Sequence, residues 1–406
     1  MKHLKHIFKG QWTASIILSV FFYQLSIGEA FAHGKYDNTD TLFVAQDGSS
    51  EFKTVGEAVE VCRAFMEYKK VIFVKKGIYK EKVIIPSWLT NIEIIGEDRD
   101  QTVITYDDHA NLPMATYRPS TLDPLTSPNP SCRRGTPPPT GGDRGGNHTH
   151  PSTLAPRPST LDSQPSTLDP IPSTLNPQPS TLDSQPKIGT FRTYTVKVEG
   201  CGITFRNITI ENNAPRKGQA VALHTEGDRL LFVNCRILGN QDTIYTGMEN
   251  TRLYFKDCYI DGTPDFIFGP STAWFEGCEI RSKVNSYVTA ASTPKYIRYG
   301  YIFHNCKLTA DEGVDKVYLG RPWRAYAHTL FIDCDLGSHI VAEGWQNWPD
   351  YHDPAQEGTV RYQEYNNCGA GANPQARVPW SRQLTQQEAA AITPQEVFGC
   401  TQWITE

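Results

Sequence analysis

A short strand-like motif that contains a cysteine recurs along the second half of the chain, and it constrains the fold more than any other feature. Each copy places an apolar or aromatic run before the cysteine and a second strand-like run after it. The cysteines of the five copies lie 23, 20, 28 and 28 residues apart, at Cys235, Cys258, Cys278, Cys306 and Cys334. A strand–turn–strand unit that repeats at such a period is typical of a solenoid.

Because the strands are short and no helices separate them, the repeat predicts an all-β fold, a β-solenoid in which each turn buries its inward side chains on the next. We expect the five cysteines to stack in the interior, about 4.8 Å apart from one strand to the next. Disulfides between neighbours are possible but not required. The absence of paired C-x-x-C spacing disfavours a metal site. Asn207 is expected near the cysteine position of an earlier copy.

Helical patterns flank the repeat. Thr54 and Glu57 form a capping-box pattern, and the apolar spacing after them predicts a helix over 54–68 with Phe65 on its buried face. The repeat is expected to stop after Trp348. Two short helices are expected beyond it, one opening at Thr385 and one at Thr393.

The N-terminal residues 1–32 resemble a secretory signal, with a basic start, an apolar core and a small-residue cleavage site at Ala30–Ala32. We therefore expect an exported protein, located outside the cell, in a cell wall or in a periplasm, with no membrane attachment after cleavage. The net charge of −5 gives no support to a nucleic-acid partner.

A Pro-Ser-Thr-Leu repeat fills residues 116–186. Proline in every copy excludes a coiled coil, and the segment has too few apolar residues to bury a core. It predicts either a flexible linker or glycan-bearing stalk, with Asn147 in a glycosylation sequon, or a repeat expansion or translated non-coding sequence. Since the strand pattern resumes directly after it, we interpret the segment as an insertion within one domain formed by residues 33–115 and 187–406.

Four blocks carry polar groups in strand-like contexts, and two of them hold aspartates. The spacing from Gln219 to Asp242 and from Asp242 to Asp265 is 23 residues in both cases, equal to one repeat period. This predicts that the two aspartates lie on adjacent turns at the same lateral position. Two close carboxylates cannot both ionise easily, so their pKa values are expected to split. Arg321 could hold one ionised through a two-pronged contact, and Gln219 and Gln241 offer amide donors suited to an oxyanion.

These blocks, in this order, resemble the signature of the pectin methylesterase (pectinesterase) family. They read Gln219–Leu223, Gln241–Thr243, Asp265–Gly269 and Leu319–Trp323. The pattern Gly77-x-Tyr79-x-Glu81 also matches, and the resemblance covers roughly residues 40–108 and 189–396. It implies a right-handed parallel β-helix with short flanking helices. It also implies hydrolysis of the methyl esters of galacturonan (pectin), with no metal or other cofactor. We expect a monomer.

The resemblance also implies roles for individual residues. Asp265 would be the nucleophile and Asp242 the acid and base. Gln219 and Gln241 would hold the oxyanion, while Arg321 orients Asp265. The expected substrate contacts include Gln219 and Arg321, together with Thr190, Trp323, Tyr245 and Phe268. For Tyr245 and Phe268 a core position is an equal alternative. His224 departs from the family, which commonly has arginine there.

Two other functions use the same residues. A glycosidase could employ Asp242 and Asp265 as its carboxylate pair, and an inactive β-helix could simply bind polysaccharide. A lyase would usually need calcium, and no acidic calcium loop is evident. The two glutamines favour an esterase, because a tetrahedral ester intermediate needs oxyanion donors and an oxocarbenium-like transition state does not.

Overall fold

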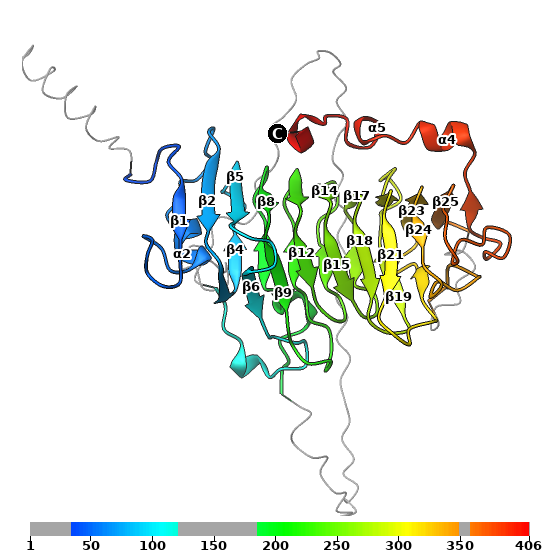
Figure 1. Cartoon of the computed structure of the whole chain (residues 1–406), viewed down its shortest axis with the longest axis horizontal. Coiled ribbons are helices and arrows are strands. Elements are labelled where there is room, and N and C mark those ends of the chain that lie inside the picture. Colours follow the sequence, from blue (N-terminus) through cyan, green and yellow to red (C-terminus); the bar gives the residue numbers. More distant parts are fainter. Residues whose placement is uncertain (1–33, 121–184, 349–357, 406) are drawn as a thin grey trace, which may run out of the picture. The chain divides into compact units, whose positions relative to one another are not determined.

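The structure, a computed structural model, describes residues 34–120, 185–348 and 358–405. The strands wind through three sheets, and every strand pairing in these sheets is parallel (Figure 1). The sheets confirm the predicted all-β solenoid as a parallel β-helix. The expected signal segment, the tetrapeptide repeats and Asn147 lie outside the described residues.

Sheet 1 is the longest and runs the length of the β-helix. In order of pairing its described strands are β1 (Leu42–Val44), β2 (Lys70–Val74), β5 (Ile92–Gly96), β8 (Thr204–Arg206), β11 (Leu230–Val233), β14 (Arg252–Lys256), β17 (Thr272–Glu276), β20 (Tyr301–His304), β23 (His328–Ile332), β25 (Arg361–Tyr365) and β26 (Arg382–Gln383).

Sheets 2 and 3 complete each turn. Sheet 2 contains β3 (Gly77–Lys80), β6 (Thr102–Tyr106), β9 (Thr209–Asn212), β12 (Arg236–Leu238), β15 (Tyr259–Gly262), β18 (Glu279–Ser282), β21 (Lys307–Ala310) and β24 (Asp335–Leu336). Sheet 3 contains β4 (Val83–Ile85), β7 (Val196–Val198), β10 (Leu223–Thr225), β13 (Ile244–Thr246), β16 (Ile267–Gly269), β19 (Tyr287–Ala291) and β22 (Tyr318–Gly320).

Part of the interior is built from columns of identical side chains contributed by successive turns. Phenylalanines of sheet 1 stack nearly parallel, with neighbouring ring centroids 4.4–5.4 Å apart, at Phe205, Phe232, Phe255, Phe275, Phe303 and Phe331. The five repeat cysteines are buried beside them as free thiols. Each thiol donates to a main-chain carbonyl one turn earlier, as Cys258 does to Phe232 at 3.5 Å. The repeat therefore stabilises the fold through stacked, mostly apolar columns.

The residue before each cysteine has a left-handed backbone, a feature that the sequence analysis missed. Asn, Asp or Gly occupies this position, with φ between 50° and 61° at Asn234, Asp257, Gly277, Asn305 and Asp333. These residue types tolerate that conformation at least cost. Asn207 has the same conformation, and the strand register aligns it with Asn234. Ile208, rather than Asn207, therefore occupies the cysteine position of its turn.

The N-terminal helix is shorter than predicted. Helix α2 (Val55–Glu60) begins with the predicted capping box of Thr54 and Glu57, and Val55 and Ala58 are buried in the core. It ends before Val61. Phe65 has a left-handed backbone and is 72% exposed, and its N–H donates to the carbonyl of Trp88. This contact with a neighbouring turn replaces helical hydrogen bonding, so the helix predicted for residues 61–68 is wrong.

The parallel pairing continues beyond Trp348, contrary to the prediction, because β25 and β26 extend sheet 1. Glu364 of β25 points inward. The Arg377 guanidinium donates two hydrogen bonds to its carboxylate, at 2.8 and 3.0 Å, and both side chains are almost fully buried. Because this last turn is closed by an ion pair rather than by apolar residues, its sequence lacks the hydrophobic signal of a strand.

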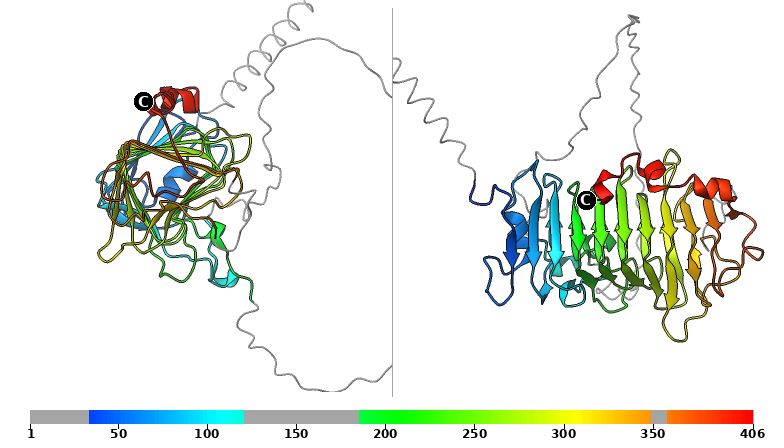
Figure 2. Two further views of the ribbon diagram at one scale, coloured as in Figure 1. Left: turned by 90° about the vertical axis from the view of Figure 1, so that its right-hand side faces the viewer. Right: turned by 45° about the horizontal axis from the view of Figure 1, so that its top comes forward.

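Short helices follow at the C-terminus. Helices α4 (Gln386–Ala390) and α5 (Pro394–Phe398) begin at the predicted caps Thr385 and Thr393, and α6 (Gln402–Thr405) follows them. They lie along the outer face of sheet 1 (Figure 2), where Phe398 packs edge-on against Tyr254. Within the described residues, no helix combines the length and apolarity needed to cross a membrane.

Candidate active site

The candidate site lies on the outer face of sheet 3, where the turns bring the polar blocks together. Gln219 precedes β10, Gln241 and Asp242 precede β13, Asp265 precedes β16, and Arg321 directly follows β22. Strands β13, β16, β19 and β22 are neighbours in the sheet. Residues from four turns of the β-helix therefore face one surface.

The strand register places the two aspartates at equivalent positions. Ile244 of β13 pairs with Ile267 of β16, so Asp242 and Asp265 lie on adjacent turns at the same lateral position, as predicted. Leu223 of β10 pairs with Ile244. The period between these two strands is two residues shorter than the 23-residue spacing, so Gln219 does not lie at the lateral position of Asp242. The main-chain N–H of Ala220 instead donates to the carbonyl of Gln241 at 3.0 Å.

Arg321 donates a hydrogen bond to each carboxylate oxygen of Asp265. Its Nε donates to Asp265 Oδ1 at 2.9 Å and its Nη2 donates to Oδ2 at 2.6 Å. The guanidinium also lies over two aromatic rings, with its central carbon 4.0 Å from the ring centroid of Tyr287 and 3.7 Å from that of Trp348. Two-pronged pairing and ring stacking together fix the orientation of both charged groups.

Both carboxyl groups are buried, but their neighbours shift their pKa values unequally. Asp242 is 8% and Asp265 is 5% exposed. Burial, reinforced by the Asp265 charge, raises the pKa of Asp242 well above its ordinary value, with Arg321 opposing the rise. Burial also raises the pKa of Asp265, but the hydrogen bonds and charge of Arg321 counteract it. Asp242 is thus the group that retains a proton more readily, and Asp265 is the one that ionises first.

Both aspartates have left-handed backbones, with φ of 67° at Asp242 and 57° at Asp265. Gly269, which closes the Asp265–Gly269 block, has φ of 126°, and a Cβ there would lie 2.3 Å from the carbonyl oxygen of Thr246. Aspartate tolerates the left-handed backbone at these two positions, and only glycine fits the backbone conformation and the close approach at residue 269.

A cleft of about 220 Å³ opens beside the carboxylates and gathers nearly all the predicted site residues. Its lining consists of Thr190, Phe191, Gln219, Gln241, Asp242, Asp265, Phe268, Ala290, Arg321, Trp323 and Trp348. Gln219, Gln241, Thr190 and Trp323 are partly exposed there, so their side chains are accessible from the cleft. The cleft thus combines a carboxylate pair, amide groups and aromatic surfaces.

Tyr245 lies behind the cleft lining rather than in it. Its ring stacks on that of Phe268 with the centroids 4.7 Å apart, and it lies tilted against the ring of Phe191 at the same centroid distance of 4.7 Å. His224 packs edge-on against the other side of Tyr245, and its Nε2 lies 2.9 Å from Glu226 Oε1. The rings of Phe191, Tyr245 and Phe268 form an aromatic wall beside the cleft, and the buried His224 packs against it. Phe268 is only 4% exposed although it lines the cleft.

Three lining residues were missed by the sequence analysis. Phe191 is 48% exposed although it is aromatic, and it directly follows the identified Thr190. Ala290 pairs with Phe268 in the strand register, which only the structure reveals. Trp348 comes from beyond the last recognised repeat. Of these, Phe191 alone had a usable signal in the sequence, because it is the neighbour of Thr190.

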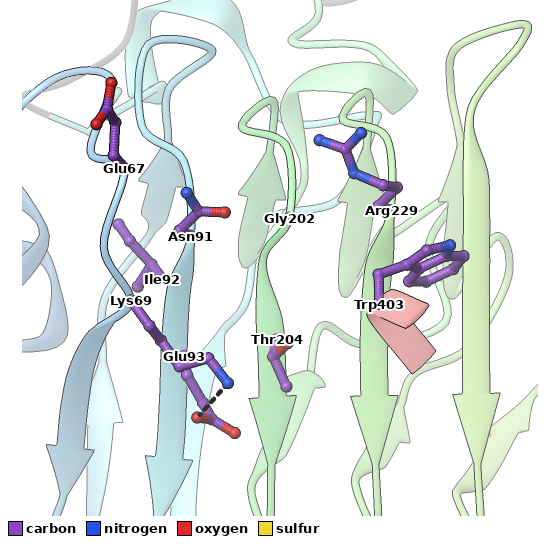
Figure 3. Close-up of a pocket in the computed structure, with 9 residues that line it drawn as sticks. All are labelled: Glu67, Lys69, Asn91, Ile92, Glu93, Gly202, Thr204, Arg229 and Trp403. Carbon is purple, nitrogen blue, oxygen red and sulfur yellow. Dashed lines mark ion pairs between the residues drawn. The ribbon is translucent and has the colours of Figure 1, made fainter. Parts of the chain in front are cut away.

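A second hollow, about 290 Å³ in volume, lies against the starts of sheet 1 strands and is flanked by Trp403 of α6 (Figure 3). Of its two carboxylates, Glu93 is paired with Lys69 at 3.6 Å and is also bound by Arg206. Because Glu93 is held in these ion pairs, the carboxylate pair of the cleft on sheet 3 is the stronger candidate for chemistry. In the part of the chain that the structure describes, no group of three or more His, Cys, Asp or Glu side chains is arranged to hold a metal.

Three parallel sheets and a cleft with paired aspartates define a β-helix protein with a carboxylate-based site. The chain matches the family model described as Pectinesterase over residues 41–127 and 179–401. It belongs to the pectinesterase family, in agreement with the resemblance seen in the sequence.

Known proteins support this assignment. The chain is 30% identical over 381 residues to a pectinesterase/pectinesterase inhibitor of Brassica campestris, covering 90% of this chain and 52% of that protein. It is 41% identical over 203 residues to pectinesterase 31 of Arabidopsis thaliana, covering 50% of this chain and 62% of that protein. The chain thus spans about half the length of the first curated relatives that it matches.

The fold matches that of pectin methylesterase from carrot with a TM-score of 0.67 and 26% identity, over 90% of this chain and 94% of that one. The likeness identifies the fold as a right-handed parallel β-helix with few short helices.

Proposed function

We propose that this protein hydrolyses the methyl esters of galacturonan, releasing methanol and leaving free carboxylates on the polymer. The observation that carries the proposal is the buried Asp265 held by Arg321 directly beside Asp242, a second carboxyl group with a more strongly raised pKa. Membership of the pectinesterase family supports the same reaction.

Asp265 would act as the nucleophile. With Arg321 on both of its oxygens, it is the carboxylate more readily ionised, and it would attack the ester carbonyl carbon to give a tetrahedral intermediate. The oxyanion would accept hydrogen bonds from the side-chain amides of Gln219 and Gln241, which line the same cleft. Pre-placed donors of this kind stabilise the developing charge without reorganisation.

Asp242 would complete the proton transfers. It would give its proton to the departing methoxide, so that methanol leaves and an acyl–Asp265 anhydride remains. A water molecule would then attack that acyl carbon and lose its proton to the Asp242 carboxylate. Cleavage of the anhydride would return Asp265 to its ionised form and free the polymer carboxylate.

The aromatic wall would bind the sugar chain. Trp323, Phe268 and Phe191 present rings to the cleft, and Tyr245 backs two of them. Thr190 adds a hydroxyl on the same rim. Apolar ring faces with a few polar groups suit pyranose rings.

We further propose that the protein is secreted, acts as a monomer and uses no metal or other cofactor. The signal-like pattern of residues 1–32 and a polymeric cell-wall substrate support export. The N-terminal sequence of protein recovered from the medium of expressing cells should begin after Ala32; an intact N-terminus on active protein would contradict this.

The test of the main proposal is methanol release from methyl-esterified pectin, measured together with new reducing ends. Wild-type protein should release methanol without new reducing ends. New reducing ends would instead indicate a glycosidase, and the absence of both products would indicate a binding protein.

Asp265→Asn should abolish methanol release, because the amide lacks the nucleophilic charge while tolerating the left-handed backbone. Asp257→Asn is the matched control, since Asp257 is exposed and has φ of 53°. Near wild-type activity of folded Asp265→Asn protein would exclude the mechanism.

Gln241 provides a graded test of the oxyanion step. Gln241→Ala should lower kcat by about 10²–10³, the usual scale for one such donor, with circular dichroism confirming the fold. If kcat stayed within a few-fold of wild type, the Gln241 amide would not be stabilising the intermediate.

A further inference from the structure

Lys82 is a buried cation outside the proposed catalytic machinery. It directly precedes β4, and its side chain is 2% exposed. Its Nζ donates to Asp108 Oδ2 at 2.6 Å and to the main-chain carbonyl of Arg192 at 2.6 Å. The second contact is informative because Arg192 ends the short 3-10 helix η3 (Thr190–Arg192), which carries Thr190 and Phe191 to the cleft.

Three tyrosine rings surround the same ammonium group. The Nζ of Lys82 lies 4.6 Å from the ring centroid of Tyr117, 4.8 Å from that of Tyr194 and 5.3 Å from that of Tyr106. Tyr117 directly follows η1 (Met114–Thr116) and Tyr106 ends β6. Lys82 therefore joins segments on both sides of residues 121–184. Contacts between a cation and aromatic faces strengthen when the cation is removed from water.

A hydrogen-bond network continues from Lys82 to the cleft rim. The side-chain amide of Asn212 donates to the carbonyls of Asp108, Thr193 and Val221 at 2.9–3.0 Å. The hydroxyl of Thr193 donates to the carbonyl of Thr190 at 2.7 Å and accepts from the N–H of Val221 at 2.9 Å. The segment that carries Thr190 is thus fixed at both Arg192 and Thr193.

The neighbouring motif accounts for where Lys82 stands. The hydroxyl of Tyr79 donates to the carbonyl of Lys75 at 2.8 Å, and the Glu81 carboxylate accepts from the N–H groups of Val55 and Gly56 at the start of α2. These contacts fix the backbone directly before Lys82 and so help to place its buried side chain.

We propose that Lys82 is a positioning residue that holds the Thr190–Arg192 segment against the cleft so that Thr190 and Phe191 can bind substrate. A buried ammonium group costs free energy unless it is fully paired, and the partners of Lys82 include the main-chain carbonyl of Arg192 in that segment. The inference rests on the proposed function, because it assigns a role in substrate binding. Thr190 and Phe191 line the rim rather than bond to Asp242 or Asp265, so loss of Lys82 should affect KM more than kcat.

The test is a double variant, Lys82→Met with Asp108→Asn, which removes the cation without leaving an unpaired buried carboxylate. Its matched control is Lys80→Met with Asp107→Asn, an ion pair of 2.8 Å two residues away with both side chains exposed. On methyl-esterified pectin the Lys82 double variant should raise KM on the order of tenfold, a cost expected from a small misplacement of a binding segment. Its kcat should stay within about threefold, and the control should change neither constant.

A purely structural role would lower the folded fraction, and with it the apparent kcat, while leaving KM unchanged; that result would overturn the proposal. Lys82→Arg keeps a cation that can donate to the Arg192 carbonyl, so it should fold and hold KM within about threefold of wild type. Folded Lys82→Arg protein with a strongly raised KM would also overturn the proposal, and this arm remains informative if the double variant does not fold.

Hydrogen exchange separates this proposal from the proposed function. Amides of residues 188–195 should exchange faster in the Lys82 double variant than in the Lys80 control, whatever the protein's activity. If wild-type protein releases no methanol but the exchange differs as stated, the proposed function fails and Lys82 still positions the segment. Unchanged exchange in residues 188–195 would overturn the positioning role itself.

Discussion

Asp242 is buried beside another carboxyl group, whereas Asp265 is buried against a guanidinium that grips both of its oxygens. This difference in partners gives two identical side chains different protonation preferences.

The sequence could predict the pair and Arg321, because motif blocks and a 23-residue period locate them. It could not predict Trp348 or Ala290, which reach the cleft through the register and path of the chain. The 23-residue spacing also does not locate Gln219, because the turn between β10 and β13 is shorter than the next one.

Replacing the Asp242 carboxyl group should stabilise the fold. Its pKa is raised in the folded protein, so the folded state binds more protons than the unfolded state above the ordinary aspartate pKa of about 3.9. Its ionisation therefore costs increasing stability as the pH rises from about 4 to the folded-state pKa. Asp242→Asn should raise the melting temperature at neutral pH, with the gain shrinking toward pH 4, while methanol release is lost.

Thermal unfolding of wild type, Asp242→Asn and the exposed control Asp257→Asn between pH 4 and 8 checks this prediction. The control should show no pH-dependent gain. A melting temperature of Asp242→Asn at or below that of wild type across the range would show that the buried carboxyl group carries no such cost.

The central strands of the β-helix are stabilised by columns of side chains that cross successive turns. The sequence predicted these strands well, because the cysteine motif marks them, but it failed where contacts outside the element decide the outcome. Helix α2 ends early because Phe65 adopts a left-handed backbone and pairs with Trp88 of another turn. Strand β25 was missed because its inward residue Glu364 is satisfied by Arg377, a partner that no local pattern reveals.

A break in the phenylalanine column should be costly. Phe255 is fully buried, with Phe232 and Phe275 stacked on its two faces at 4.7 Å each. Phe255→Ala should lower the free energy of unfolding by about 3–5 kcal/mol, the scale for large-to-small core substitutions, as measured by denaturant unfolding. Phe43→Ala is the control, because Phe43 is 48% exposed in edge strand β1. Equal losses in both variants would mean that the column does not dominate core stability.

At the scale of the whole molecule, the chain leaves and re-enters the β-helix at neighbouring points around residues 121–184. Pro113 pairs with Lys187 in an isolated antiparallel bridge, and the N–H of Ile188 donates to the carbonyl of Leu112 at 3.0 Å. The family match likewise stops at residue 127 and resumes at 179. Both observations support the interpretation of an insertion within one domain. Tyr117, which the sequence analysis assigned to the insertion, is buried against Lys82 and belongs with the β-helix.

We therefore predict that residues 121–184 can be replaced by a short Gly/Ser loop without loss of the fold. Because the two flanks already lie side by side, a short loop can join them, and the lower entropy cost of closing it should add at most roughly 2 kcal/mol of stability. The replacement retains Tyr117, so the contacts of Lys82 stay intact. Thermal unfolding should show a melting temperature equal to or slightly above that of the full chain, and methanol release from pectin should be unchanged or increased, since the Thr190 segment lies directly after the replaced residues. A second variant that also removes residues 117–120 should be less stable, because it deletes Tyr117 from the Lys82 cluster. If the first variant lost several kcal/mol of stability, the replaced residues would have to pack against the β-helix, and the insertion model would be wrong.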